Sequence, residues 1–303
     1  MTQKATVLFD APGPRAKTRN AIVGVVGVAV LAGAFAWVVY RFDQTGQFDA
    51  KKWDPFQYSG IQQLIFDGLK STLKAFALAV VFSLILGALL AAGRLSDHRP
   101  VRWAATAFVT FFRAMPLLIL IYFLYVAPAK LSGWPTWLHW MNDPLWPLVI
   151  GLTLYNGTVQ AETMRAGIQA LPRGQSEAAY ALGMRKSQVM LTILVPQGIR
   201  AMLPTIISQM VVTLKDTSLG FIITYPELLY TARQIGAVQD YGLPIIPAAI
   251  VIGTIYILLC IALSVFAVWL EKFLGKSRQG RPAKIETLPG ETLAAAGVVS
   301  GDR

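Results

Sequence analysis

The sequence predicts an all-α, polytopic membrane protein with about six transmembrane helices. Its 303 residues are 55% hydrophobic and only 14% charged, and the mean hydropathy is +0.53. These values are typical of a chain that lies mostly in lipid, whereas a soluble chain of this length would be expected to form two domains. The single cysteine, Cys260, lies within an apolar run, so a disulfide-rich secreted fold is not indicated.

Six apolar stretches are long enough, or nearly long enough, to cross a hydrocarbon core that requires about 20 helical residues. They cover residues 21–40, 73–92, 104–126, 145–160, 199–214 and 245–270. The fifth is the weakest, because it holds Arg200 near its start, Pro204, and the polar Ser208 and Gln209.

The distribution of basic residues supports all six spans. Most of the 27 Lys and Arg fall in the N-terminal tail, in the loops after the second and fourth stretches, and in the C-terminal tail. The positive-inside rule then places both termini in the cytoplasm. Without the fifth span, the basic C-terminal tail would lie on the opposite side.

Composition divides the chain into four parts. We expect residues 1–20 to be a cytoplasmic tail, 21–40 an additional first transmembrane helix, 64–274 the main transmembrane domain, and 275–303 a disordered cytoplasmic tail with little to bury. The first stretch has features of a signal peptide, because basic residues precede it and it contains Ala-Phe-Ala. Its apolar run continues to Tyr40, which is long for a cleaved segment and favours a retained helix.

The segment 162–196, between the fourth and fifth stretches, is cytoplasmic by the charge rule. Pro172 suits the first turn of a helix and Gly183 suits the position just beyond its end, so the chain from Gln175 to Leu182 should form about two helical turns. Any cytoplasmic loop can contain such a helix, so this feature alone does not indicate a function.

The same segment contains Glu-Ala-Ala, three residues, Gly, nine residues, Ile, two residues and Pro. This spacing resembles the EAA loop of type I ABC-importer permeases and departs from it only at Val195, where leucine is usual. The resemblance implies that the short helix sits in a cleft of an ATPase subunit and carries nucleotide-driven motion into the membrane helices. The residues that match the coupling motif are Glu177, Ala178, Ala179, Gly183 and Pro196.

Two further stretches resemble the polar amino-acid branch of these permeases. Residues 112–118 read Phe-Arg-Ala-Met-Pro-Leu-Leu, and residues 214–219 read Leu-Lys-Asp-Thr-Ser-Leu. The resemblance covers about 64–274 and is strongest to glutamate uptake permeases of actinobacteria. It implies a pair of ATP-binding subunits, an extracytoplasmic amino-acid-binding protein, and a second permease chain, more often a related chain than a second copy.

The chain has no phosphate-binding loop, dinucleotide fingerprint or nucleophile elbow. ATP and magnesium are therefore expected on the partner ATPase, with no cofactor and no catalytic site on this chain. His98 and His139 have no carboxylate or cysteine partners at metal-ligand spacing, so no metal site is predicted.

Arg113 is the first candidate for the translocation path, because an ionisable group inside a span costs several kcal/mol unless it is paired or hydrated. It can bind a substrate carboxylate, or it can extend towards the cytoplasmic face or pair with a carbonyl freed by Pro116. Glu162 is close enough in sequence to Arg165 for a structural helical ion pair.

The other path candidates are Lys215, Asp216, Thr217 and Ser218, at the outer end of the fifth stretch. The two charged residues can pair with each other or with a second subunit. The two hydroxyl residues can cap the next helical segment or contact the substrate.

Two other functional classes were weighed. A secondary transporter or channel would need coupling-ion residues near the midplane or internal repeats, and only Arg113 is of that kind. A membrane enzyme would need a cluster of acid, base or metal-binding residues, which the sequence lacks. Within the importer hypothesis, Arg113, Lys215 and the basic residues Lys70 and Lys74 favour an acidic substrate, with glutamate as the specific expectation.

Overall fold

The computed structural model of the chain describes residues 13–130 and 140–275. Within these ranges the chain forms helices joined by turns, with no strand, as the sequence predicts. Most of the two predicted tails, residues 1–12 and 276–303, lies outside the described ranges. The long helices are α1 (Pro14–Gln44), α2 (Ser59–Arg94), α3 (Arg99–Ala114), α4 (Leu117–Lys130), α5 (Leu145–Gln169), α8 (Val195–Asp216) and α10 (Ile245–Gly275). The shorter ones are η1 (Ala50–Lys52), η2 (Asp54–Gln57), α6 (Arg173–Ala181), α7 (Lys186–Gln188), the π-helix η4 (Val189–Leu194), η5 (Thr217–Ile223), α9 (Leu228–Gly236) and η6 (Gln239–Tyr241).

Four of the described helical segments are long and apolar enough to cross a membrane alone. They are Pro14–Gln44, Ser59–Arg94, Lys186–Ile223 and Ile245–Leu270. The third of these contains the weak fifth stretch, which is therefore part of a continuous helical segment from α7 to η5. Helices α3 and α4 together would make a fifth span.

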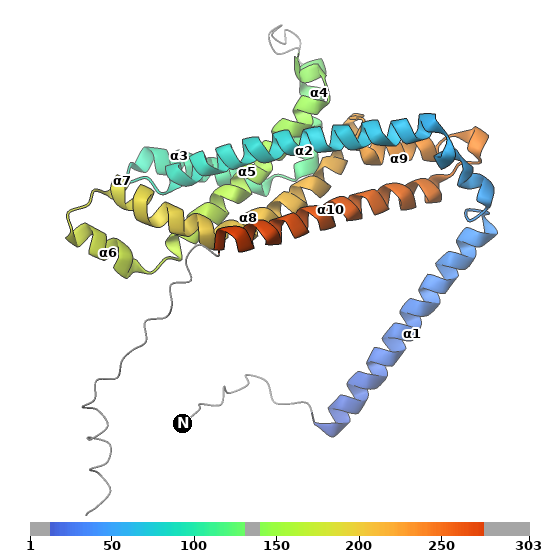
Figure 1. Cartoon of the computed structure of the whole chain (residues 1–303), viewed down its shortest axis with the longest axis horizontal. Coiled ribbons are helices and arrows are strands. Elements are labelled where there is room, and N and C mark those ends of the chain that lie inside the picture. Colours follow the sequence, from blue (N-terminus) through green and yellow to red (C-terminus); the bar gives the residue numbers. More distant parts are fainter. Residues whose placement is uncertain (1–12, 131–139, 276–303) are drawn as a thin grey trace, which may run out of the picture.

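The third predicted span is not the straight helix that the sequence suggested. Helix α3 ends at Ala114, α4 begins at Leu117, and the two axes differ in direction by 97°. Met115 is extended, with φ −83° and ψ 130°, because the residue before a proline avoids the α conformation and Pro116 lacks a backbone N–H. Figure 1 shows α4 pointing away from the bundle while α3 runs beside α2.

Helix α5 is the centre of the bundle and contacts α2, α3, α4 and α8. Two glycines permit its close contact with α2. A Cβ atom at Gly87 would lie 2.7 Å from the Cβ of Gln160, and one at Gly157 would lie 2.9 Å from Leu86 Cδ2. Because its neighbours cover it, α5 can carry polar residues such as Asn156 and Gln160, which explains why it is less apolar than the lipid-facing spans.

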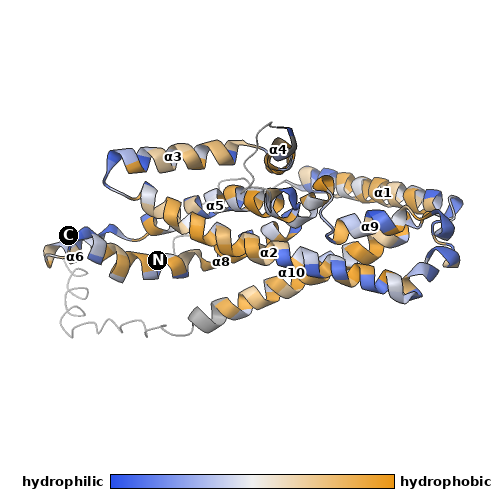
Figure 2. Cartoon of the chain, turned by 90° about the horizontal axis from the view of Figure 1, so that it is seen from above, coloured by the Kyte–Doolittle hydropathy of each residue, from blue (hydrophilic) through white to orange (hydrophobic). Residues whose placement is uncertain are grey.

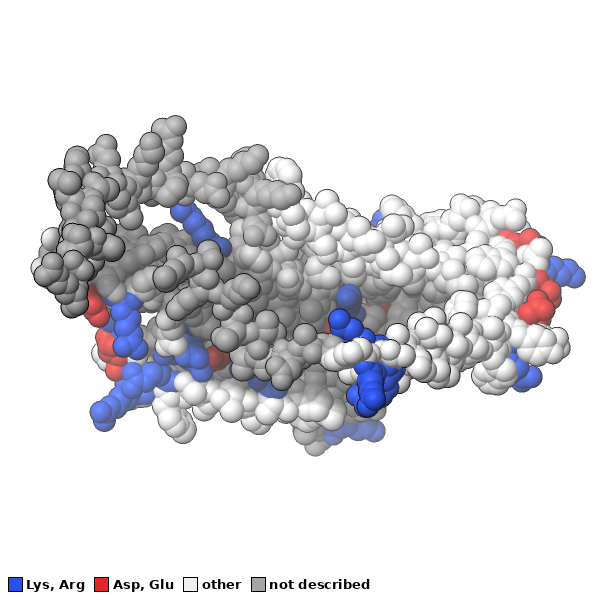
Figure 3. Space-filling model, turned by 90° about the horizontal axis from the view of Figure 1, so that it is seen from below, with Lys and Arg blue, Asp and Glu red and all other residues white. Residues whose placement is uncertain are grey.

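Helix α1 stands apart from the bundle, and none of its residues is buried (Figure 1). Its last residues connect through η1 and η2 to the start of α2. The bundle itself has two ends, one with α6 and α7 and the other with α9, which we call the α6 end and the α9 end (Figure 1). Apolar residues run along α8 and α10 (Figure 2), while acidic and basic side chains gather at both ends of the bundle (Figure 3).

Candidate functional site

The predicted short helix is present as α6, and it begins two residues earlier than the sequence indicated. Its N-cap is Pro172, and it ends where Gly183 adopts φ +78°. The Gly183 N–H donates to the Tyr180 carbonyl, and the Met184 N–H donates to the Ala179 carbonyl. This pair of bonds is a Schellman motif, which requires the left-handed conformation that glycine adopts without steric cost.

The side chains of α6 divide into one packed residue and an exposed surface. Ala179 is 3% exposed, and α6 packs against η4. Glu177 and Ala178 are exposed, as are the large apolar side chains of Tyr180 (47%) and Leu182 (84%). A small helix that presents exposed apolar side chains and a carboxylate without an ion-pair partner among the described residues has the character of a protein contact surface.

A polar clamp holds the segment from α6 to α8 to the loop between α2 and α3. Lys186 at the start of α7 forms an ion pair with Asp97 and donates a hydrogen bond of 3.0 Å to the Leu95 carbonyl. The Lys186 hydrogen bond holds the pKa of Asp97 below its usual value. Pro196 is the second residue of α8 and follows directly after the π-helix η4. The segment from α6 to α8 is therefore tied to α2 at the α6 end.

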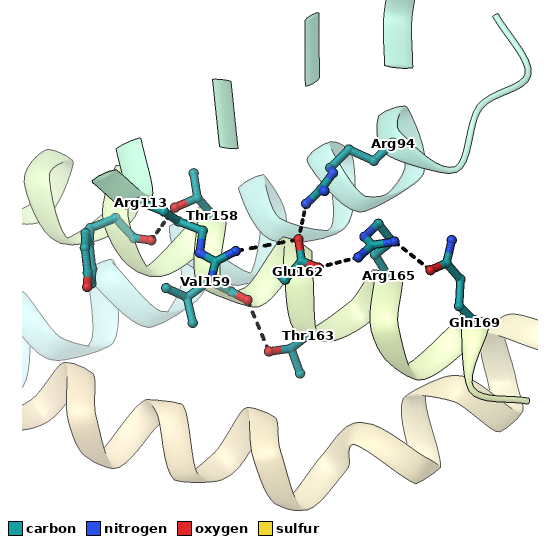
Figure 4. Close-up of polar contacts among 9 residues, drawn as sticks. Arg94, Arg113, Thr158, Val159, Glu162, Thr163, Arg165 and Gln169 are labelled. Carbon is teal, nitrogen blue, oxygen red and sulfur yellow. Dashed lines mark hydrogen bonds and ion pairs between the residues drawn. The ribbon is translucent and has the colours of Figure 1, made fainter. Parts of the chain in front are cut away.

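Glu162 of α5 accepts interactions from three arginines, as Figure 4 shows. Arg94 from α2 and Arg165 from α5 donate hydrogen bonds to its two carboxylate oxygens. Arg113 from the end of α3 lies 3.7 Å from one of them, with 47% of its side chain exposed. The predicted Glu162–Arg165 pair is thus confirmed, and Arg113 pairs with a carboxylate rather than with a freed carbonyl.

A second polar group joins α5 to α8 nearer the α9 end. The Gln209 Nε2 atom donates to Asn156 Oδ1 at 2.8 Å, and Asn156 also faces Asp216. The buried Gln160 Oε1 atom, one turn further along α5, has no hydrogen-bond partner among the described residues. An unpaired amide oxygen inside an apolar bundle is costly, so Gln160 is a candidate contact for a polar molecule or another chain.

The structure separates the path candidates at the end of α8 and the start of η5 onto different faces. Asp216 lies on the face towards Asn156, whereas Lys215 and Ser218 line an open groove against α10. Successive helical residues are about 100° apart, which places neighbouring candidates on different sides. Thr217 is buried, and its hydroxyl donates back to the Leu214 carbonyl of α8. The hydroxyl therefore does not cap the next segment, η5.

Glu227 is a buried acid that sequence reasoning missed. It caps α9 by accepting from the Leu229 and Tyr230 N–H groups, and it accepts a 2.7 Å hydrogen bond from the Tyr256 hydroxyl of α10. Burial raises the pKa of Glu227 to about 7. Burial likewise raises the pKa of Tyr225 to about 12, and its hydroxyl donates to the Ser71 carbonyl of α2. An acid just before the apolar run of α9 was the available sequence signal for this cap.

No group of three or more His, Cys, Asp or Glu within residues 13–130 and 140–275 is arranged to hold a metal ion.

Comparison with known proteins gives consistent matches. Residues 56–276 match the family model described as "Binding-protein-dependent transport system inner membrane component". The glutamate transport system permease protein GluD of Corynebacterium glutamicum is 39% identical over 260 residues, covering 85% of this chain and 93% of that protein. The glutamate/aspartate import permease protein GltK of Escherichia coli is 35% identical, covering 69% and 92%.

The substrates named for more distant relatives differ. The arginine transport system permease protein ArtQ of Bacillus subtilis is 31% identical and covers 70% of this chain and 90% of that protein. Among solved structures, an amino acid ABC transporter crystallised with histidines matches with a TM-score of 0.61 and 28% identity, covering 70% of this chain and 94% of that chain.

Proposed function

We propose that this chain, which belongs to the family of binding-protein-dependent transport system inner membrane components and is the permease subunit of an amino-acid ABC importer, transports glutamate. We also propose that α6 couples this transport to the ATPase subunits. The observation that carries the coupling role is the exposed surface of α6, with Glu177 unpaired beside two exposed apolar side chains. Glu177 would meet a basic group of the ATPase, Ala178 would permit close approach, and Gly183 ends the helix sharply.

The clamp explains how motion at α6 would reach the membrane helices. Helix α6 packs on η4, which continues directly into α8, and Lys186 ties the same segment to the loop that follows α2. A displacement of α6 would therefore move α8 relative to α5, where the hydrogen bond between Gln209 and Asn156 lies. Such a change between two packings is what alternating access requires.

The proposed path follows α5 from the α9 end to the α6 end. It starts at Asp216, passes Asn156 and Gln209, and reaches Arg113 beside Glu162, which is about 9 Å further along the helix. Amide groups can accept from an ammonium and donate to a carboxylate, so both ends of an amino acid can be held by them. Three arginines around the single carboxylate of Glu162 leave excess positive charge, which favours an acidic substrate over a basic one.

The remaining parts of the proposal concern partners and orientation. The ATP-binding pair carries ATP and magnesium, and a binding protein delivers the amino acid from outside. We propose a related permease chain as the second subunit. We also propose that the α6 end and both termini are cytoplasmic, because the basic loop after α2 and the basic segment from α6 to α8 lie at the α6 end and the sequence of both tails is basic.

Uptake into proteoliposomes tests this proposal. The vesicles would contain this chain, its neighbouring permease and ATPase, and the binding protein, with labelled glutamate, glutamine or arginine offered outside. We expect ATP-dependent uptake of glutamate, with arginine a poor competitor. Glu177→Lys should abolish uptake and weaken ATPase association, whereas Asp67→Lys, at an exposed position in the part of α2 near α9, should keep ATPase association intact.

Three results would contradict separate parts of the proposal. Arginine uptake with no glutamate uptake would contradict the substrate while leaving the importer role unchanged. Full activity in Glu177→Lys would contradict the coupling role of α6. Uptake that needs no ATP would favour a secondary transporter.

A further inference from the structure

Helix α1 lies outside the part of the chain that its family shares, because the family match begins at residue 56. It has 31 residues, is long and apolar enough to cross a membrane, and has no buried side chain. Figure 1 shows α1 apart from the bundle and joined to it through the segment that precedes α2.

The segment after α1 is fixed to the start of α10. The ring of Tyr58 stacks on that of Tyr241 with centroids 5.9 Å apart. The side chain of Lys52 passes Gly242, within 3.6 Å of the position that a Cβ atom would occupy there. These contacts place the end of α1 beside the first residues of α10, and the two helices run in opposite directions through the membrane.

A groove of about 1020 Å³ runs along α10 on its side towards α8. Its α10 wall includes Ile257, Ile261 and Val265, all more than half exposed, with the small residues Cys260 and Ser264 between them. The opposite wall is formed by Val211 and Lys215 of α8 and by Ser218 of η5.

The groove is on the side of α8 opposite to the proposed path. Val211 and Lys215 lie two and six positions after Gln209 on α8, which are rotations of about 200° and 240°. Asp216 lies seven positions after Gln209, at about 340°, and so stays on the same side as Gln209. The polar group with Asn156 therefore faces one way and the groove faces the other. A helix in the groove would support α8 from behind without blocking the path.

The bilayer restricts where α1 can go. Transmembrane helices tilt on average about 20° from the bilayer normal, so α1 must run nearly alongside the bundle when both are in lipid. The turn after α1 is closed by local hydrogen bonds, with Gly46 at φ +61° as the helix-ending residue. A change in the backbone angles of residues 45–49 would turn α1 towards the bundle. With its end held at α10, α1 reaches the groove without any change in the bundle.

We propose that in the membrane α1 packs antiparallel into the groove between α8 and α10 of its own chain. This inference depends on the membrane location and not on the identity of the substrate. It sets a register, because Cys260 lies about 22 Å along α10 from Ile245, and the same distance back from Gln44 along α1 reaches Ala29. The small residues Gly27 and Gly33 flank that position and would permit close helix contact.

Cys260 is the only cysteine in the chain, so it can report this contact directly. Single cysteines would be placed at each position from 27 to 31 in the assembled transporter in native membranes, and a mild oxidant added. A disulfide requires Cα atoms about 4.4–6.8 Å apart. We expect linkage at one or two of these positions, three or four residues apart, and none for Val39→Cys, which lies about 15 Å nearer the α9 end.

Two variants make the test specific. In a chain with Cys260→Ser and Ser264→Cys, the reactive positions should move one turn towards the start of α1, to the neighbourhood of Val25. Chains with different tags, one carrying only the α1 cysteine and the other only Cys260, should give no linked dimer, because the contact is within one chain.

Linkage only between differently tagged chains would overturn the proposal and assign the groove to a second copy. Absence of linkage with both Cys260 and Ser264→Cys, when each thiol reacts with a maleimide in the membrane, would also overturn it and leave the groove to lipid or to another subunit.

Discussion

Replacing Glu162 by glutamine should destabilise the bundle far more than removing an exposed carboxylate. The change leaves Arg94, Arg113 and Arg165 close together without an anion. Breaking a buried ion pair by removing one partner costs about 3–5 kcal/mol. Because the Glu162 side chain keeps 26% of its surface exposed, we expect a cost just below that range, about 2–3 kcal/mol.

The measurement is thermal unfolding of the detergent-purified chain, followed by the fluorescence of its 8 tryptophans. The expected decrease in Tm for Glu162→Gln is at least about 5 °C. Asp67→Asn is the matched control, because Asp67 pairs with Lys70 on the surface, with 56% and 61% of the two side chains exposed. Such a pair contributes about 0–1 kcal/mol.

A double-mutant cycle with Arg113 tests the reasoning further. In the parent chain, Arg113→Gln should lower stability slightly, since the side chain is 47% exposed and 3.7 Å from Glu162. In the Glu162→Gln chain the same change should raise stability, because it removes one of three unpaired positive charges. Equal Tm shifts for Glu162→Gln and Asp67→Asn, or a cycle without this change of sign, would refute the view that the carboxylate holds the three arginines together.

Three further outcomes follow from the same structure. Burial raises the pKa of Glu227 from its usual 4.5 to about 7. The folded state therefore binds the proton more tightly, and the free energy of unfolding should fall by about 2–3 kcal/mol as pH rises from 4.5 through 7. Glu227→Gln should remove this dependence when unfolding is measured at several pH values, and a pH slope that persists would exclude Glu227 as its source. Gly87→Ala should destabilise the bundle by about 1–3 kcal/mol, because the new Cβ would lie 2.7 Å from the Gln160 Cβ. Gly253→Ala, whose new Cβ would have no atom within 4 Å, should be neutral or stabilising in the same thermal assay. Equal Tm shifts for the two variants would argue against close packing at Gly87. Gly183→Val should lower the free energy of unfolding by about 1–2 kcal/mol, because valine is strained at φ +78°. It should reduce ATPase association in a pull-down assay while membrane insertion stays normal. Undiminished association would show that the sharp end of α6 is not needed for binding the ATPase.

The sequence alone determined the features that depend on local chemistry. Apolar length and the need to satisfy backbone groups in lipid identified the membrane helices, including the weak fifth one, which forms part of the segment Lys186–Ile223. Proline and glycine restrict the backbone of their own residues, so Pro172 and Gly183 located α6 to within two residues. The pairing of Glu162 with Arg165 was predictable because the two are on the same helical face.

Only the tertiary structure decided which distant residues meet. Arg94 and Glu162, or Lys186 and Asp97, are far apart in the sequence, and their contact depends on how α2, α5 and α7 pack. The 97° break at Pro116 also exceeded what the sequence indicated, because a proline inside an apolar run is compatible with either a kink or a change of direction. Packing likewise made α5 the centre of the bundle, where buried amides are tolerated. It also placed Asp216 and Lys215 on different faces of α8, one towards Asn156 and the other on the groove against α10. Neighbouring helices determine which face of a span is covered and which is exposed, and no local pattern contains that information.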